Sequence, residues 1–156
     1  MSVLAELNKT SLDLRRSRDE LAKSLSVVVS NANQIAKDRA TDKGNYEVTD
    51  DDAIQAIRKA VKQTEDTIAI LADNHAEDGD LYVRSARELT ILKNLLPQGP
   101  DAKTISRFVQ DYLVYSNTER NIKAMGPIMK SLGDQYGAAL DRGMASQVVR
   151  IELVED

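Results

Sequence analysis

The chain has 156 residues, of which 42% are hydrophobic and only 4% aromatic, and its formal net charge is −4. It contains no cysteine, which excludes disulfide bonds, thiolate nucleophiles and thiolate metal ligands. No stretch resembles a signal peptide or is apolar enough to span a membrane, so we expect a soluble cytoplasmic protein.

The N-terminal half shows the spacing of amphipathic helices. β-Branched residues do not form alternating runs, so the composition favours helices over sheets. We expect a first helix over residues 3–18 and a second over residues 19–39, and the sequence leaves open whether the two are continuous. Residues 41–48 are polar and contain a glycine, which predicts a loop.

The third expected helix has the clearest start. Thr49 is a good N-cap, Asp50 and Asp51 place negative charge at the positive end of the helix, and Asp52 occupies the reciprocal capping position. Mostly apolar side chains then recur at steps of three and four, which predicts a narrow seam that packs against another helix. The side chains of this seam are Ile54, Ile57, Val61, Thr64, Ile68 and Leu71.

The acidic segment 73–80 ends this helix and contains the single histidine, His75. Oxygen ligands this close together suit Ca²⁺ or Mg²⁺, but their spacing does not match an EF-hand loop. A solvated turn between helices explains the segment better, so we expect no metal site and no bound cofactor.

A fourth helix is expected over residues 81–96, and the sequence Pro-Gln-Gly-Pro at residues 97–100 ends it. This segment is the expected domain boundary. It divides the chain into an N-terminal helical domain, residues 1–96, and a C-terminal helical domain, residues 97–156.

The C-terminal domain begins with a fifth helix that Asp101 can cap. One face of this helix is expected to carry Ile105, Phe108, Val109 and Tyr112. Residues 117–120 form a connector to the next helix.

The sixth helix contains a proline, Pro127, which is tolerated only in the first turn. The regular helix is therefore expected to begin near residues 124–126, and Gly133 and Gly137 are expected to end it. A last helix is expected over residues 144–153. The inward side chains of these two helices are expected to be Ile122, Met125, Met129, Leu132, Met144, Val148 and Ile151.

Residues 120–150 carry five basic and two acidic residues, a local excess of three positive charges. Two interpretations follow. The last two helices either close a small core, with methionines filling gaps, or present a basic face that follows a folded RNA backbone by its shape. No phosphate-binding loop, nucleophile elbow or zinc-binding helix motif occurs, so we expect no independent catalysis.

At these residues the chain resembles the GatB/YqeY family. Residues 125–129, Met-Gly-Pro-Ile-Met, are similar to the family pattern Met-Gly-Lys-Val-Met, and Asp141 with residues 145–149 is similar to the turn and last helix that follow it. Residues 88–97 are similar to the motif Glu-Leu-x-Ile-Leu-x-x-Tyr-Leu-Pro at the end of the family's fourth helix. The likeness covers residues 3–153.

The resemblance implies an all-helical fold with a larger N-terminal and a smaller C-terminal unit. In the GatB subunit of the glutamine-dependent tRNA amidotransferase, the equivalent C-terminal part contacts the body of the tRNA, and the chemistry occurs in other domains. The resemblance therefore implies a non-catalytic accessory module of translation, whose partner is tRNA or a tRNA-handling enzyme.

The chain also departs from the family pattern. Pro127 replaces a usual lysine, Ala139 replaces an arginine, and Gly143 stands where a basic residue is common. A helical protein–protein adaptor that kept the fold without RNA binding is therefore the alternative, and an enzyme in its own right has the least support. The RNA-binding residues that remain are Lys123, Lys130, Arg142 and Arg150.

Overall fold

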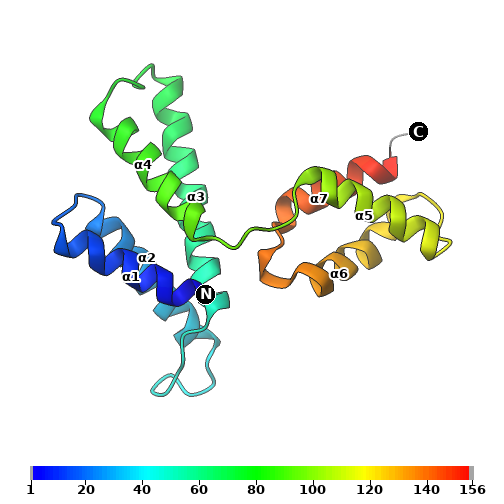
Figure 1. The fold of residues 1–156 in the computed structure, drawn as a ribbon, viewed down its shortest axis with the longest axis horizontal. Coiled ribbons are helices and arrows are strands. Elements are labelled where there is room, and N and C mark those ends of the chain that lie inside the picture. The colour runs from blue at the N-terminus through cyan, green and yellow to red at the C-terminus, as the bar shows by residue number, and fades with distance from the viewer. Residues whose placement is uncertain (1, 155–156) are drawn as a thin grey trace. The chain divides into compact units, whose positions relative to one another are not determined.

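The computed structural model describes residues 2–154, and every regular element in this range is a helix (Figure 1). The all-helical fold expected from the sequence is confirmed. No helix in the described range is both long and apolar enough to cross a membrane. The helices are α1 Val3–Arg16, α2 Ala22–Arg39, α3 Asp50–Asp73, α4 Asp80–Leu95, α5 Ala102–Tyr115, α6 Met125–Tyr136 and α7 Arg142–Val154, with the 3₁₀ turns η1 Ile122–Ala124 and η2 Gly137–Ala139 on either side of α6.

The chain divides into two compact units, Met1–Leu96 and Pro97–Asp156, called the first and the second unit below. Each unit has a hydrophobic core of its own. The core of the first unit consists of Leu7, Leu21, Leu25, Val28, Ala32, Ala53, Ala56, Ile57, Ala60 and Leu92. The core of the second unit consists of Ile105, Val109, Ala124, Ile128, Leu132, Leu140, Ala145, Val149 and Leu153.

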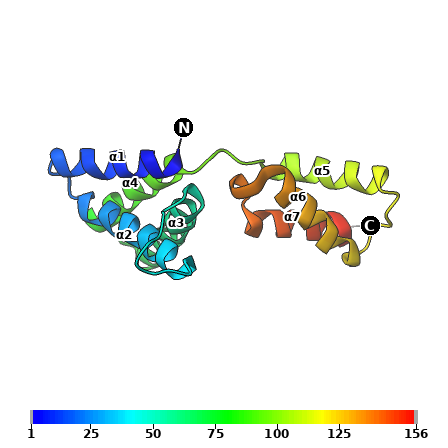
Figure 2. The ribbon, with the colours of Figure 1, turned by 90° about the horizontal axis from the view of Figure 1, so that it is seen from below.

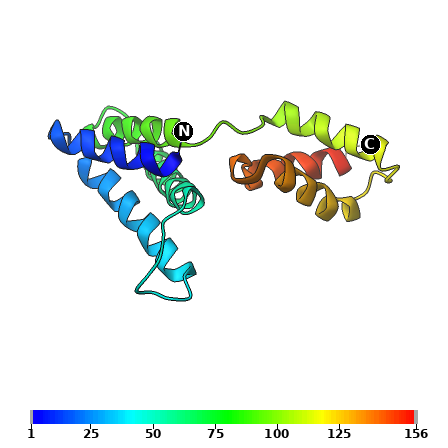
Figure 3. The ribbon, with the colours of Figure 1, turned by 60° about the horizontal axis from the view of Figure 1, so that its bottom comes forward.

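In the first unit, a turn separates α1 from α2 (Figure 3), so the two helices are not continuous. Arg18 has a φ of 55°, a left-handed conformation that ends the helical path. Asp19 then accepts a hydrogen bond from the backbone N–H of Leu21 at 2.9 Å and forms an ion pair with Arg87 of α4. The turn between α1 and α2 is therefore fixed to the fourth helix.

Helix α3 contacts α1, α2 and α4, and its buried face is correspondingly wide. Ile54, Ile57 and Thr64 of the expected seam are buried. Ala53 and Ala56 are also buried and form a second stripe beside the seam. Their small side chains let the neighbouring helices approach closely. The prediction of a narrow seam was therefore wrong, because the buried face of α3 is wider than this seam.

In the second unit, α7 packs against both α5 and α6 (Figure 2). The expected start of α6 near residues 124–126 is confirmed. The expectation that Gly133 ends α6 was wrong, because the helix continues to Tyr136. It ends at Gly137, whose φ of 54° is the left-handed conformation that glycine adopts without strain.

Two side chains expected to face inward point to solvent instead. Ile122 is 52% exposed because it lies in η1, where the tighter 3₁₀ path does not continue the register of α6, and Ala124 takes the core position. Ile151 is 51% exposed, because α7 turns Val149 and Leu153 toward the core.

We expect limited proteolysis with a protease of broad specificity, such as proteinase K, to cut first within residues 41–47. Residues 41–47 are all exposed and lie outside helices, so a protease can bind them as an extended chain. The connector at residues 98–100 is less accessible, because Pro100 is buried and a Cβ added to Gly99 would lie 2.1 Å from the carbonyl oxygen of Ala139. Mass spectrometry of the first fragments tests this order, and early cleavage inside α3 would show that the core is misplaced.

Candidate nucleic-acid interface

The candidate site lies on the α6–α7 hairpin, defined here as η1, α6, η2 and α7. Pro127 is the third residue of α6, where its missing N–H breaks no helical hydrogen bond. The side chain of Asn121 caps η1 by accepting from the backbone N–H of Lys123 at 2.9 Å. Asp141 likewise accepts from the backbone N–H of Met144 at 3.1 Å and starts α7. A side-chain cap thus marks the start of α7, whereas α6 follows directly on the capped turn η1 and has no side-chain cap of its own.

Lys123, Lys130, Arg142 and Arg150, the four cations below, are all exposed. Lys123 lies in η1 and Lys130 in the middle of α6, whereas Arg142 is the first residue of α7 and Arg150 lies in its second half. Helices α6 and α7 run antiparallel (Figure 2), so η1 contacts α7 at one end of the hairpin, and Arg142, the first residue of α7, lies at the other end. The four cations therefore spread along the hairpin and form no compact cluster.

Arg142 occupies a position that helix stability alone does not explain. A cation at the first residue of a helix faces the positive end of the helix dipole, which is mildly unfavourable. Its guanidinium lies against α6 where Gly133 leaves room, since a Cβ added to Gly133 would come within 3.4 Å of an Arg142 guanidinium nitrogen. The Arg142 side chain therefore lies on the neighbouring helix beside Gly133.

Two acidic residues of the hairpin are engaged in holding the fold. Asp141 caps α7, as described above. Glu152 accepts hydrogen bonds from Ser106 and, at 3.3 Å, from Gln110, and so ties α7 to α5. Within residues 2–154, none of the four cations forms an ion pair. Their positive charges are therefore available to a ligand.

Sequence reasoning found the four cations from their type and position, but it missed the contact of Arg142 with Gly133 and the roles of Asp141 and Glu152. The position of Asp141 directly before a helix was a usable signal for a cap. Nothing local marks Gly133 or Glu152, because their partners lie on other helices. These contacts leave a basic surface that can approach a polyanion through its phosphates.

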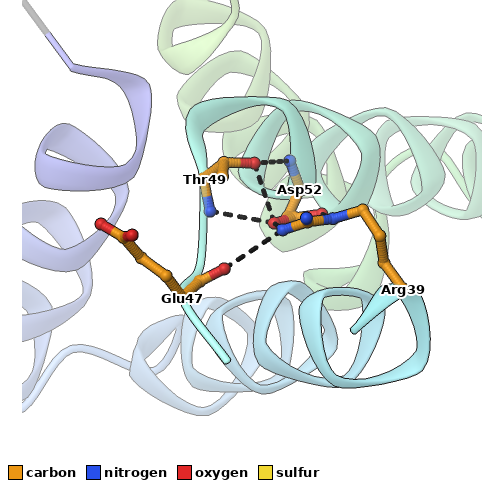
Figure 4. A network of polar contacts seen from close by, with 4 residues as sticks. All are labelled: Arg39, Glu47, Thr49 and Asp52. Carbon is orange, nitrogen blue, oxygen red and sulfur yellow. Dashed lines mark hydrogen bonds and ion pairs between the residues drawn. The ribbon is translucent and has the colours of Figure 1, made fainter. Parts of the chain in front are cut away.

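A cluster of charged and polar side chains in the first unit joins the end of α2 to the start of α3 (Figure 4). Asp52 receives hydrogen bonds from Arg39 at 2.8 and 3.2 Å and from the backbone N–H of Thr49 at 2.9 Å. The capping box expected from Thr49 and Asp52 is present. Arg39 also donates to the carbonyl oxygen of Glu47 at 3.1 Å, which closes the loop between the two helices.

This cluster has a structural role, since Asp52 is only 3% exposed. The hydrogen bond from Arg39 lowers the pKa of the Asp52 carboxyl to about 2, and hydrogen bonds from Thr49 act in the same direction.

The acidic segment around His75 forms the turn between α3 and α4, with His75 at a φ of 54°. Nowhere in the described range do three or more histidine or acidic side chains gather in a way that could hold a metal ion.

A protein-family model described as "Yqey-like protein" matches residues 6–153. The match includes both units and therefore the whole α6–α7 hairpin up to Leu153. No curated protein is similar enough to the chain to count as a match.

Proposed function

Because the chain belongs to the Yqey-like protein family, we propose that it is a non-catalytic accessory module that associates with tRNA, similar to the tail of the GatB subunit of the tRNA-dependent amidotransferase. The observation that carries this proposal is the set of four exposed cations on the α6–α7 hairpin, none of them in an ion pair with another described residue.

The protein is expected to bind tRNA through the phosphates and the overall shape of the RNA. Lysine and arginine side chains that contact phosphates position a protein on a nucleic acid and carry little sequence information. The spread of the four cations along one hairpin suits a folded RNA backbone better than a single phosphate group. We therefore expect binding that tolerates different tRNAs and weakens steeply with salt.

The affinity is expected to be modest. The second unit contains seven basic and eight acidic residues, so its attraction for RNA is local and does not come from its net charge. Pro127 and Gly143 also lack the basic side chains that are common at these places in the family. Fewer phosphate contacts give both a weaker affinity and a smaller salt dependence.

A protein–protein adaptor is the second candidate. Ala139, which stands in the place of a family arginine, is half-buried, and its carbonyl oxygen lies against Gly99. The turn that offers a cation in the family here contributes to packing within the unit. This observation favours a surface that binds protein over one that binds RNA.

The test is a titration of fluorescently labelled tRNA, followed by anisotropy at several salt concentrations. Replacing all four cations by alanine is expected to abolish binding at moderate salt. If each contacts one phosphate, the slope of log affinity against log salt falls by nearly 4, at about 0.9 per contact. Circular dichroism should show an unchanged helical signal, because exposed charges contribute little to stability.

The matched control removes four exposed lysines of the first unit, Lys23, Lys37, Lys59 and Lys62, and changes the net charge by the same amount. This variant is expected to bind tRNA nearly as well as the wild type. An equal loss in both variants would show that only net charge matters. No binding of the wild type at low salt would favour the adaptor.

A further inference from the structure

Four of the six aromatic side chains of the chain lie on α5 and α6 of the second unit. The ring centroids of Phe108 and Tyr112 on α5 are 6.4 Å apart, with an angle of 27° between the ring planes. The rings of Phe108 and Tyr136 of α6 form a T-shaped pair, with centroids 6.5 Å apart. Tyr115 follows Tyr112 by three residues on the same side of α5. In a chain so poor in aromatic residues, this concentration calls for an explanation.

Core packing does not explain Tyr115, which is 89% exposed. Together with Phe108, Asp111, Tyr112 and Ser116 it lines a shallow depression of about 410 Å³, called the Tyr115 pocket below. The other four residues follow Phe108 by three, four, seven and eight positions, so they lie on one side of α5 and its C-cap. Ser116 ends this face by donating a hydrogen bond to the carbonyl oxygen of Tyr112 at 2.6 Å. The pocket therefore offers ring surface to a ligand.

The charges around the Tyr115 pocket select the kind of ligand. Asp111 is exposed and forms no hydrogen bond or ion pair with any residue in the described part of the chain. The last turn of α5 has no basic residue to balance the negative end of its helix dipole. The faces of the aromatic rings are also electronegative. All three features attract a cation, and the first two repel a phosphate.

We propose that the Tyr115 pocket binds an arginine side chain of a partner protein. A guanidinium is planar, so it can stack on the ring of Tyr115 or Tyr112 while it donates two hydrogen bonds to the carboxylate of Asp111. An ammonium group is a compact charge and is strongly hydrated, and it matches this arrangement less well. The pocket lies on α5, so this inference does not depend on the RNA-binding role of the α6–α7 hairpin.

The test uses the full-length protein and NMR signals of its aromatic side chains. The probe is N-acetyl-arginine N′-methylamide, and the matched control ligand is the corresponding citrulline derivative, which has nearly the same shape and no charge. The arginine probe is expected to shift the signals of Phe108, Tyr112 and Tyr115. The citrulline derivative is expected to bind at least about fivefold more weakly, as for the loss of a cation–π contact and an ion pair at an exposed site.

Two variants and one control variant assign the interaction to the pocket. Asp111→Asn and Tyr115→Ala are each expected to weaken binding of the arginine probe by a similar factor, and both side chains are exposed, so the fold is retained. Tyr46→Ala, at an exposed tyrosine of the first unit, is expected to leave binding unchanged.

Three results would overturn the proposal. The first is the absence of shifts at the three rings up to the solubility limit of the probe. The second is equal binding of the arginine and citrulline derivatives. The third is tighter binding of a single-stranded uridine oligonucleotide than of the arginine probe at the same rings, with a further gain in oligonucleotide affinity after Asp111→Asn. That result would identify the pocket as a stacking site for RNA bases.

Discussion

Replacing Ile128 by alanine is expected to lower the free energy of unfolding of the second unit by about 3 kcal/mol, because the removed atoms leave a cavity in a packed core. Ile128 is fully buried at the centre of that core. For a unit of roughly 60 residues, such a loss is a large part of the total stability. The first unit has its own core and is expected to keep its stability.

The matched control is Ile122→Ala, the same substitution six residues earlier on a side chain that is 52% exposed. It is expected to change stability by no more than about 0.5 kcal/mol. Thermal unfolding followed by circular dichroism gives the size of the effect, and NMR signals from each unit show which one unfolds. Simultaneous loss of signals from both units in Ile128→Ala would mean that they unfold as one cooperative body.

Replacing Asp52 by asparagine is expected to cost about 2 kcal/mol of stability at neutral pH, as judged from the shift in its pKa. The substitution removes the negative charge that accepts hydrogen bonds from Arg39 and Thr49 at the junction of α2 and α3. Arg39 is half-exposed and can be solvated by water, which limits the loss. Urea unfolding at pH 7 measures the difference.

The pH dependence identifies the charge as the cause. The pKa of Asp52 is about 2 in the folded protein and 3.8 without the interactions, so its contribution is fully present above pH 3.8 and is lost as the pH falls toward 2. The difference between wild type and Asp52→Asn should therefore shrink over this range. Asp51→Asn, at an exposed neighbour, is the control and should show little effect. A difference that persists unchanged at pH 2 would contradict the electrostatic explanation.

Features that depend on a few neighbouring residues could be predicted from the sequence alone. Thr49 with Asp52, and Asp101, marked the starts of α3 and α5, because a cap needs only a side chain and a backbone N–H three residues later. Pro127 placed the start of α6, because proline is harmless only in the first turn. The all-helical class followed from the spacing of apolar residues.

The α5 face with Ile105 and Val109 could still be predicted from spacing, but the exact residues that α6 and α7 bury could not, because they depend on tertiary packing. Residues 144, 148 and 151 and residues 145, 149 and 153 have similar helical spacing. The packing of α7 against α5 and α6 buries the second set, leaves Met144 and Val148 at the edge of the core, and exposes Ile151. Ile122 is exposed because the 3₁₀ turn breaks the register, and Gly133 lies inside α6, which continues to Tyr136. These choices depend on neighbours distant in the sequence.

The candidate interface divides in the same way. The types and positions of the four cations are visible in the sequence, and so is the local excess of positive charge. The sequence does not show that Glu152 is held by α5. It also does not show that Tyr115 is exposed to solvent, although other residues of its helix pack inward. Whether a charge or a ring faces a ligand depends on the helices packed around it, and these are set only by the assembled core.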